Sequence, residues 1–273
     1  MIKKLMCWSL SFLILSSVQI GVAQAALESH EGYKKPQSTI KLKVLKIEDQ
    51  GVKKRVQIQL TKIKDNMPVT LEDLKEIHSR KIHILIIDDA LEDYSHVHPE
   101  ALKEPGTYEF DWKPKTQGNY RMWADLLPIS TQAQEYAEAD LTLGQVKKSD
   151  INRKTILESQ QDGYHFKLSF EDESLAVGTP TMGKIVVTDS QGNPVKDLEP
   201  LMGAFAHIVG FSEDLKTVVH IHPMGEEPSK PTDRGGPDLE FHLQPEAQGF
   251  IKLFAQVNIK GKEIFAPFGV TVK

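Results

Sequence analysis

The sequence predicts an all-β chain of two tandem immunoglobulin-like β-sandwich domains that arise from an internal repeat. Short strand-like segments bounded by turn residues fill the chain, and no convincing amphipathic helix interrupts them. In addition, the block of residues 73–99 recurs at a fixed offset as residues 197–223. About seven short strands in each half, with frequent turns, are typical of β-sandwiches.

The first half alternates apolar and polar residues or forms short apolar runs. We expect strands at residues 40–47, 52–62, 81–87, 94–98, 107–112, 119–124 and 138–143. Residues 126–134 look like a loop. Residues 71–78 have some helical character, but a loop is the better prediction because the repeat partner contains Pro200 and Gly203.

The second half repeats this order. We expect strands at residues 164–170, 184–188, 204–211, 217–221, 239–243, 250–257 and 263–272. The alternating pattern of residues 110–124 returns at residues 241–255, so the repeat continues past the duplicated block. A polar stretch separates the halves, which predicts domains at residues 39–147 and 158–273 with a linker at 148–157.

The first 25 residues have the pattern of a secretory signal peptide. Two lysines precede the apolar stretch 10–22, and Ala23-Gln24-Ala25 is a small-x-small cleavage site. We expect cleavage after Ala25, a flexible leader at 26–38, and a periplasmic or secreted protein. A membrane anchor fits less well because the apolar stretch is short and contains polar residues.

Charge and cysteine content exclude several functions. The net charge is −5 and no basic stripe appears, which argues against a nucleic-acid partner. The one cysteine, Cys7, lies in the segment expected to be removed. The mature chain would then contain no disulfide, cysteine nucleophile or thiolate metal site, so any metal ligands must be His, Met or carboxylate side chains.

The repeated block carries a histidine pattern. The sequence His-x-His-Pro occurs at residues 96–99 and again at 220–223, and a lone histidine lies thirteen residues upstream of each copy, at His83 and His207. Seven of the ten histidines lie inside the two blocks. This concentration is the main functional signal of the sequence.

A β-hairpin can bring these side chains together. If the lone histidine and the His-x-His pair lie on consecutive strands, a turn centred near Ala90 places His83 opposite Val97, to within one residue, and side chains at i and i+2 share a strand face. Imidazole suits Zn²⁺, Cu²⁺ and Ni²⁺. The alternative is that the histidines are structural, because apolar residues surround His83 and His207.

Further ligands follow from the repeat, in which His78 corresponds to Met202, and a thioether favours copper. The predicted metal ligands are His78, His83, His96, His98, Met202, His207, His220 and His222. Copper is the leading metal and zinc the second. Met224 is a weaker candidate. Asp125 follows a predicted strand and could support a ligand, although no specific feature of the sequence supports that role. We interpret His165 and His242 as surface or structural residues.

The chain resembles a group of exported bacterial proteins with immunoglobulin-like domains and this histidine signature. The resemblance is carried by Asp73-Leu74, His78 and His83, by the motif at 96–99, and by residues 118–126, Gly-Asn-Tyr-Arg-Met-Trp-Ala-Asp-Leu. Residues 176–195 are similar to the opening of YtkA-like domains, a related β-sandwich. The resemblance implies the fold and an envelope role in copper or heavy-metal handling. Met202 departs from the pattern.

We therefore expect an exported metal-binding protein without catalytic activity. The sequence contains no Gly-x-Ser-x-Gly segment, no Ser-His-Asp arrangement and no carboxylate at an obvious general-base position. The alternative is a non-catalytic interaction module whose histidines are structural and whose partner is another envelope protein. Metal loading distinguishes the two hypotheses.

Overall fold

The computed structural model describes residues 38–77, 79–146, 150–221 and 223–273. The expected signal peptide at 1–25 lies outside the described residues, as does the leader except for Ser38. The described part is all-β, as predicted, and its strands form two groups, each of two sheets. In this part, no helix is long and apolar enough to cross a membrane.

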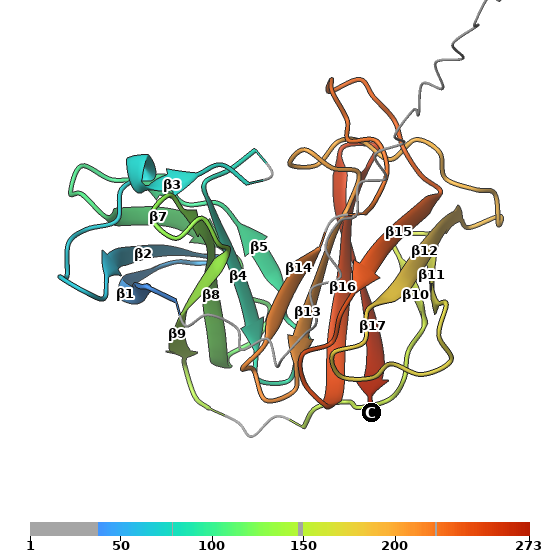
Figure 1. Cartoon of the computed structure of the whole chain (residues 1–273), viewed down its shortest axis with the longest axis horizontal. Coiled ribbons are helices and arrows are strands. Elements are labelled where there is room, and N and C mark those ends of the chain that lie inside the picture. The colour runs from blue at the N-terminus through green and yellow to red at the C-terminus, as the bar shows by residue number, and fades with distance from the viewer. Residues whose placement is uncertain (1–37, 78, 147–149, 222) are drawn as a thin grey trace, which may run out of the picture. The chain divides into compact units, whose positions relative to one another are not determined.

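In the first half, one sheet has the strand order β1-β2-β7-β6 and the other β3-β8-β4-β5, with β9 paired to β8 (Figure 1). The bounds are β1 Ile40–Gln50, β2 Lys53–Lys62, β3 Leu74–Lys75, β4 Ile82–Asp88, β5 Ser95–Val97, β6 Glu100–Ala101, β7 Thr107–Trp112, β8 Gly118–Pro128 and β9 Glu135–Leu143. All the pairings between these strands are antiparallel.

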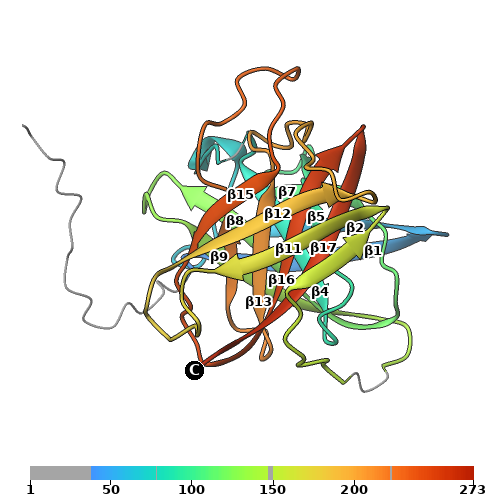
Figure 2. The same ribbon diagram turned by 90° about the vertical axis from the view of Figure 1, so that its right-hand side faces the viewer.

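In the second half, the sheet orders are β10-β11-β12-β15 and β14-β13-β16-β17. Figure 2 shows β11, β12 and β15 of the first of these sheets side by side. The bounds are β10 Glu158–Gln161, β11 Tyr164–Phe170, β12 Thr181–Asp189, β13 His207–Ser212, β14 Val218–Ile221, β15 Asp238–Leu243, β16 Gly249–Ile259 and β17 Lys262–Val272.

Two expectations for the first half are corrected. Residues 126–128 do not begin a loop, because β8 pairs with β4 through Ile82 and Leu126 and with β3 through Leu74 and Pro128. Residues 71–77, the described part of the predicted loop at 71–78, are not simply a loop either. Leu71–Asp73 forms a 3₁₀ turn (η1), and the short strand β3 follows it. The Asp73 carboxylate accepts hydrogen bonds from the N–H and the hydroxyl of Thr70, which caps this turn.

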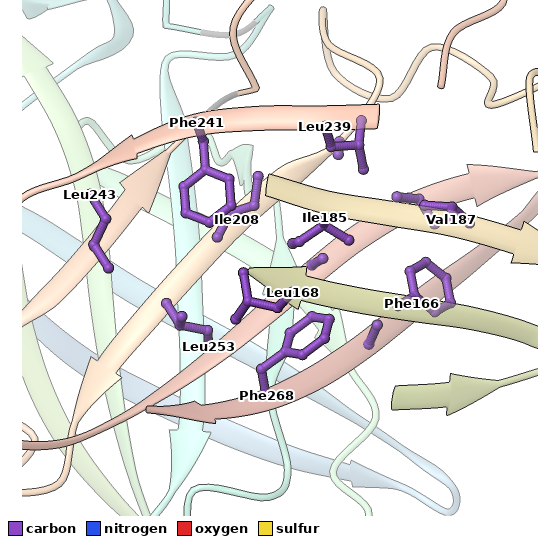
Figure 3. Close-up of a cluster of buried hydrophobic side chains, with 14 of the residues drawn as sticks. Phe166, Leu168, Ile185, Val187, Ile208, Leu239, Phe241, Leu243, Leu253 and Phe268 are labelled. Carbon is purple, nitrogen blue, oxygen red and sulfur yellow. The ribbon is translucent and has the colours of Figure 1, made fainter. Parts of the chain in front are cut away.

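Each sandwich has its own apolar core between its two sheets. In the second half, aromatic residues such as Phe166, Phe241 and Phe268 fill this core together with aliphatic residues of facing strands (Figure 3). In the first half, Trp112 and Tyr120 lie in the corresponding core with their rings 4.8 Å apart, edge to face.

A third apolar cluster joins the two halves. It contains Leu85, Ile87 and Trp123 from β4 and β8, together with Phe211 and Phe254 from β13 and β16. These strands therefore bury both faces: one lies against the core of their own sandwich and the other against this shared cluster. Burial on both faces explains why β4 is a nearly continuous apolar run, a pattern usual in strands covered on both sides.

The faces that meet are equivalent under the repeat. On β8 the residues that face the other half are Arg121, Trp123 and Asp125. On β16 they are Lys252, Phe254 and Gln256. Arg121 donates to the Leu215 carbonyl of the other half, and Lys252 forms an ion pair of 2.8 Å with Glu92. Each half thus uses a basic side chain at the same position to hold the β-hairpin turn of the other, as in a two-fold interface.

Replacing the shared aromatic layer tests this packing. Trp123→Ala should lower the free energy of unfolding by about 3–5 kcal/mol, because a buried ring of 1% exposure is lost and leaves a cavity. Val52→Ala, at a position 83% exposed, should change it by less than about 0.5 kcal/mol. Chemical denaturation followed by far-UV circular dichroism measures both. Equal stabilities of the two variants would contradict the packing described.

Candidate metal centre

The register of the β4–β5 hairpin places the predicted ligands on one face. Ile84 pairs with Val97 and Leu85 with His96, one residue away from the nominal pairing of His83 with Val97. Val97 packs against the sandwich core, and His96 faces the opposite side. With the nominal pairing, His83 would have shared the face of Val97, so the one-residue shift is what allows the histidines to converge.

Three imidazoles meet at this point. The Nδ1 atom of His83 lies 3.0 Å from Nε2 of His96 and 3.1 Å from Nε2 of His98. One ring nitrogen from each histidine lies within 4.8 Å of the others, an arrangement that can hold a metal ion. His83 is fully buried, His96 is 8% exposed and His98 is partly buried. Two residues of the second half, His207 and Gln256, lie beside His96, and this contact between the halves was not predicted from the sequence.

The loop before β4 fixes the orientation of the His83 ring. Its Nε2 atom lies 2.9 Å from the carbonyl oxygen of Ile77, six residues earlier. A carbonyl only accepts, so Nε2 carries the proton and, in a neutral ring, Nδ1 carries the lone pair. The second half repeats the contact, since Nε2 of His207 lies 2.9 Å from the Leu201 carbonyl, also six residues earlier.

The His96 ring is oriented from the other half. Its Nδ1 atom lies 2.9 Å from Oε1 of Gln256, whose amide nitrogen is directed to the carboxylate of Glu263 at 3.1 Å. Because the carboxylate can only accept, the amide presents its oxygen to His96. Nδ1 of His96 is then the protonated nitrogen, and Nε2 carries the lone pair.

These assignments bring two lone pairs face to face. Nδ1 of His83 and Nε2 of His96, 3.0 Å apart, are both acceptors when the rings are neutral. Two neutral rings in this arrangement repel each other, and either a proton on one of the facing nitrogens or a metal ion against both relieves that repulsion. A metal with bonds of about 2.0–2.1 Å in tetrahedral geometry separates two ligand nitrogens by roughly 3.3 Å, close to the spacing seen. The donor set therefore fits a metal ion that prefers imidazole.

Of the other predicted ligands, the structure describes His207, Met202 and the backbone of His220. The His207 ring lies 5.6 Å from that of His96, so the lone histidine of the second copy adjoins the first cluster. Met202 is half-buried in the tight turn between Leu201 and Ala204, with a positive φ of 52°. His78 and His222 lie outside the described residues. The backbone of His220 pairs with Val209.

The surroundings of the cluster are apolar on one side and open on the other. Tyr94, two residues before His96, is buried against Phe254 and Phe211. Burial, and after it the carboxylates of Asp125 and Glu263, raise the pKa of Tyr94 well above its usual value. His98 lines a surface cavity of about 290 Å³, which gives the cluster a route to solvent.

Two aspartates order the connection between β4 and β5. The Asp88 carboxylate accepts from the N–H groups of Glu92 and Asp93. Burial raises the pKa of Asp88, although these two N–H groups lower it. The Asp93 carboxylate accepts from the Tyr120 hydroxyl at 2.7 Å and from the Lys115 N–H, which anchors the turn to the next strands. The acidic run is therefore a structured turn.

Several side chains remain apart from the cluster. His165 lies on β11, and His242 is exposed on β15. Met224 is 53% exposed. Asp125 is fully buried and pairs with His83 across the strands, and its carboxylate accepts from the Gln134 amide. Its equivalent in the repeat is Gln256, so aligning the two halves could have identified Gln256 from the sequence.

Comparisons with known proteins identify a family and little else. The family described as a domain of unknown function (DUF8832) matches residues 37–141 and again 159–273, in agreement with the internal repeat. No curated protein matches the chain.

Solved structures match only loosely. A Salmonella α2-macroglobulin mutant (11% identity, TM-score 0.26) is matched over 90% of this chain and 15% of its own length. A conserved domain protein from Bacillus anthracis (11%, TM-score 0.27) is matched over 90% and 91%, and MtrC from Shewanella baltica (7%, TM-score 0.25) over 86% and 69%. These scores carry no argument about this chain.

The anchoring of the hairpin turn is testable. Asp93→Ala should lower the free energy of unfolding by about 1–3 kcal/mol, because the Tyr120 hydroxyl and a backbone N–H lose their buried acceptor. Asp172→Ala, at an exposed position, is the matched control and should be near neutral. Urea titration measures both, and a neutral Asp93→Ala would show that the turn is not held by this carboxylate.

Proposed function

The chain belongs to the DUF8832 family, and we propose that it is an exported, non-catalytic protein that binds and carries copper through His83, His96 and His98. The observation that supports this most is the convergence of one ring nitrogen each from His83, His96 and His98 at a single point, where they could hold a metal ion. The charged start and apolar stretch of residues 1–25 support export to the periplasm or beyond.

We propose copper because imidazole ligands bind Cu²⁺ more tightly than the other divalent first-row metal ions. For imidazole ligands, divalent binding generally increases to Cu²⁺ and then falls at Zn²⁺. Met202 and His78, at equivalent positions, are proposed as additional ligands, and a thioether would favour Cu(I). His207, His220 and His222 are proposed to bind metal in the second half. We also propose that the second half is related to YtkA-like domains.

Two features favour carriage over catalysis or protein docking. His83 and His96 are buried and only His98 of the three is partly exposed, so an ion held there would be enclosed by rings on most sides. The interaction-module alternative expects apolar surface on the histidine-bearing strands, but Leu85 and Ile87 of β4 pack in the shared cluster with Phe211. That apolar face is used within the chain.

Metal stoichiometry tests the proposal. Mature chain loaded with Cu²⁺ or Zn²⁺, and with Cu⁺ under reducing conditions, should lose about one bound ion when His96 and His98 are both changed to alanine, because two of three ligands are removed. Elemental analysis after dialysis counts the ions.

The matched control is His165→Ala with His242→Ala, which removes two histidines outside the cluster and should leave the count unchanged. Circular dichroism checks that both variants fold. An unchanged stoichiometry in the His96/His98 variant would reject the site, and a wild-type chain that binds none of these ions would leave the histidines structural.

A further inference from the structure

A residue of the second half reaches into the first cluster. Gln256 lies on β16, 160 residues from His96 in the sequence, and is only 2% exposed. Its side chain contacts both His96 and Glu263, the latter on the adjacent strand β17. A buried amide held between two partners is a fixed hydrogen-bonding group, since leaving either side unpaired is costly.

This contact decides which nitrogen of His96 is available. The Glu263 carboxylate orients the amide, the amide oxygen accepts from Nδ1–H, and Nε2 is left with the lone pair directed at His83. The reverse tautomer would place a proton on Nε2 and block it as a ligand. Outer partners of ligating histidines act in this way in metal sites, by fixing tautomer and ring orientation.

We propose that Gln256 is a positioning residue of the metal centre, oriented by Glu263, so that the site of the first half is complete only when the second half is docked against it. The inference rests on the proposed function. It deepens that function, because it makes the contact between the halves a determinant of metal affinity.

Neighbouring contacts support the same coupling. Lys252, Phe254 and Gln256 point to one side of β16, and they meet in turn Glu92, Tyr94 and His96 of the first half. One strand of the second half thus contacts the β5 hairpin at every second residue. An ion bound to this hairpin stabilises the docked arrangement, because a ligand that binds only one state shifts the equilibrium towards it.

The test compares three variants in the full mature chain. Gln256→Leu keeps the size but removes the acceptor, and should weaken Cu²⁺ and Zn²⁺ binding by about 10–100-fold, as loss of such partners does elsewhere. Glu263→Gln alone removes the group that orients the amide and should weaken binding by a smaller factor. The combined exchange Gln256→Glu with Glu263→Gln places a carboxylate oxygen opposite Nδ1–H of His96 and an amide donor opposite that carboxylate. It should therefore recover most of the affinity.

Gln244→Leu, an exposed glutamine of the same half, is the control and should bind as the wild type does. Affinities come from competition with a chelator. Long-range ¹H–¹⁵N spectra of the metal-free protein add a readout that lost packing would not reproduce: His96 should carry its proton on Nδ1 in the wild type and in the exchange variant, and shift towards the Nε2–H form in Gln256→Leu.

Two outcomes would overturn the inference. If Gln256→Leu binds within about threefold of the wild type and His96 keeps its tautomer, Gln256 does not position the ligand, while the proposed function stands. If Gln256→Leu weakens binding and the exchange variant fails to recover it although it folds, the effect is one of packing. A wild-type chain that binds neither ion rejects the proposed function itself, and the spectra then report the tautomer separately.

Discussion

The proposed site depends on one buried contact, in which Nδ1 of His83 lies 3.0 Å from Nε2 of His96. Neither ring can rotate away from the other without losing a second contact, since His83 is fixed by the Ile77 carbonyl and His96 by Gln256. The electrostatic conflict is therefore built in by the fold. A proton on one ring or a metal ion between the rings removes it, and imidazole nitrogens at this spacing suit a first-row transition metal.

The same arrangement explains why the halves pack as they do. Strands β4 and β13 carry the lone histidines on faces that would otherwise lie open to solvent, and both faces are buried in the shared cluster. The histidines lie at the edge of that cluster, where the His96 and His207 rings are 5.6 Å apart. Duplication has thus produced an interface as well as a second copy of the motif, and the candidate centre lies at that interface.

Much of the fold could be predicted from the sequence, for definite reasons. Alternation and turn residues predicted the strands, and the fixed offset between the blocks predicted two equivalent sandwiches, which the family match and the sheets confirm. The convergence of His83, His96 and His98 was also predicted. The hairpin register lies one residue from the central prediction and within its stated range of one residue, because the centre of a turn cannot be located more precisely from a run such as Asp88–Asp93.

What the sequence could not predict is the contribution from distant residues. Aligning the two halves identifies Gln256 as the equivalent of Asp125, but its contact with His96 of the other half follows only from three-dimensional packing. Three further features have no sequence pattern: burial of the amide, the contact with the Glu263 carboxylate, and the packing of β16 against β5. Short strands such as β3 and β6 were missed because two residues carry no periodicity.

The most direct measurement is anomalous X-ray diffraction from crystals of the mature chain grown with Cu²⁺ or Zn²⁺. We expect an anomalous peak about 2.0–2.1 Å from Nδ1 of His83, Nε2 of His96 and Nε2 of His98. A fully loaded crystal in which the metal peaks lie only elsewhere, with these three nitrogens still in direct contact, would contradict it.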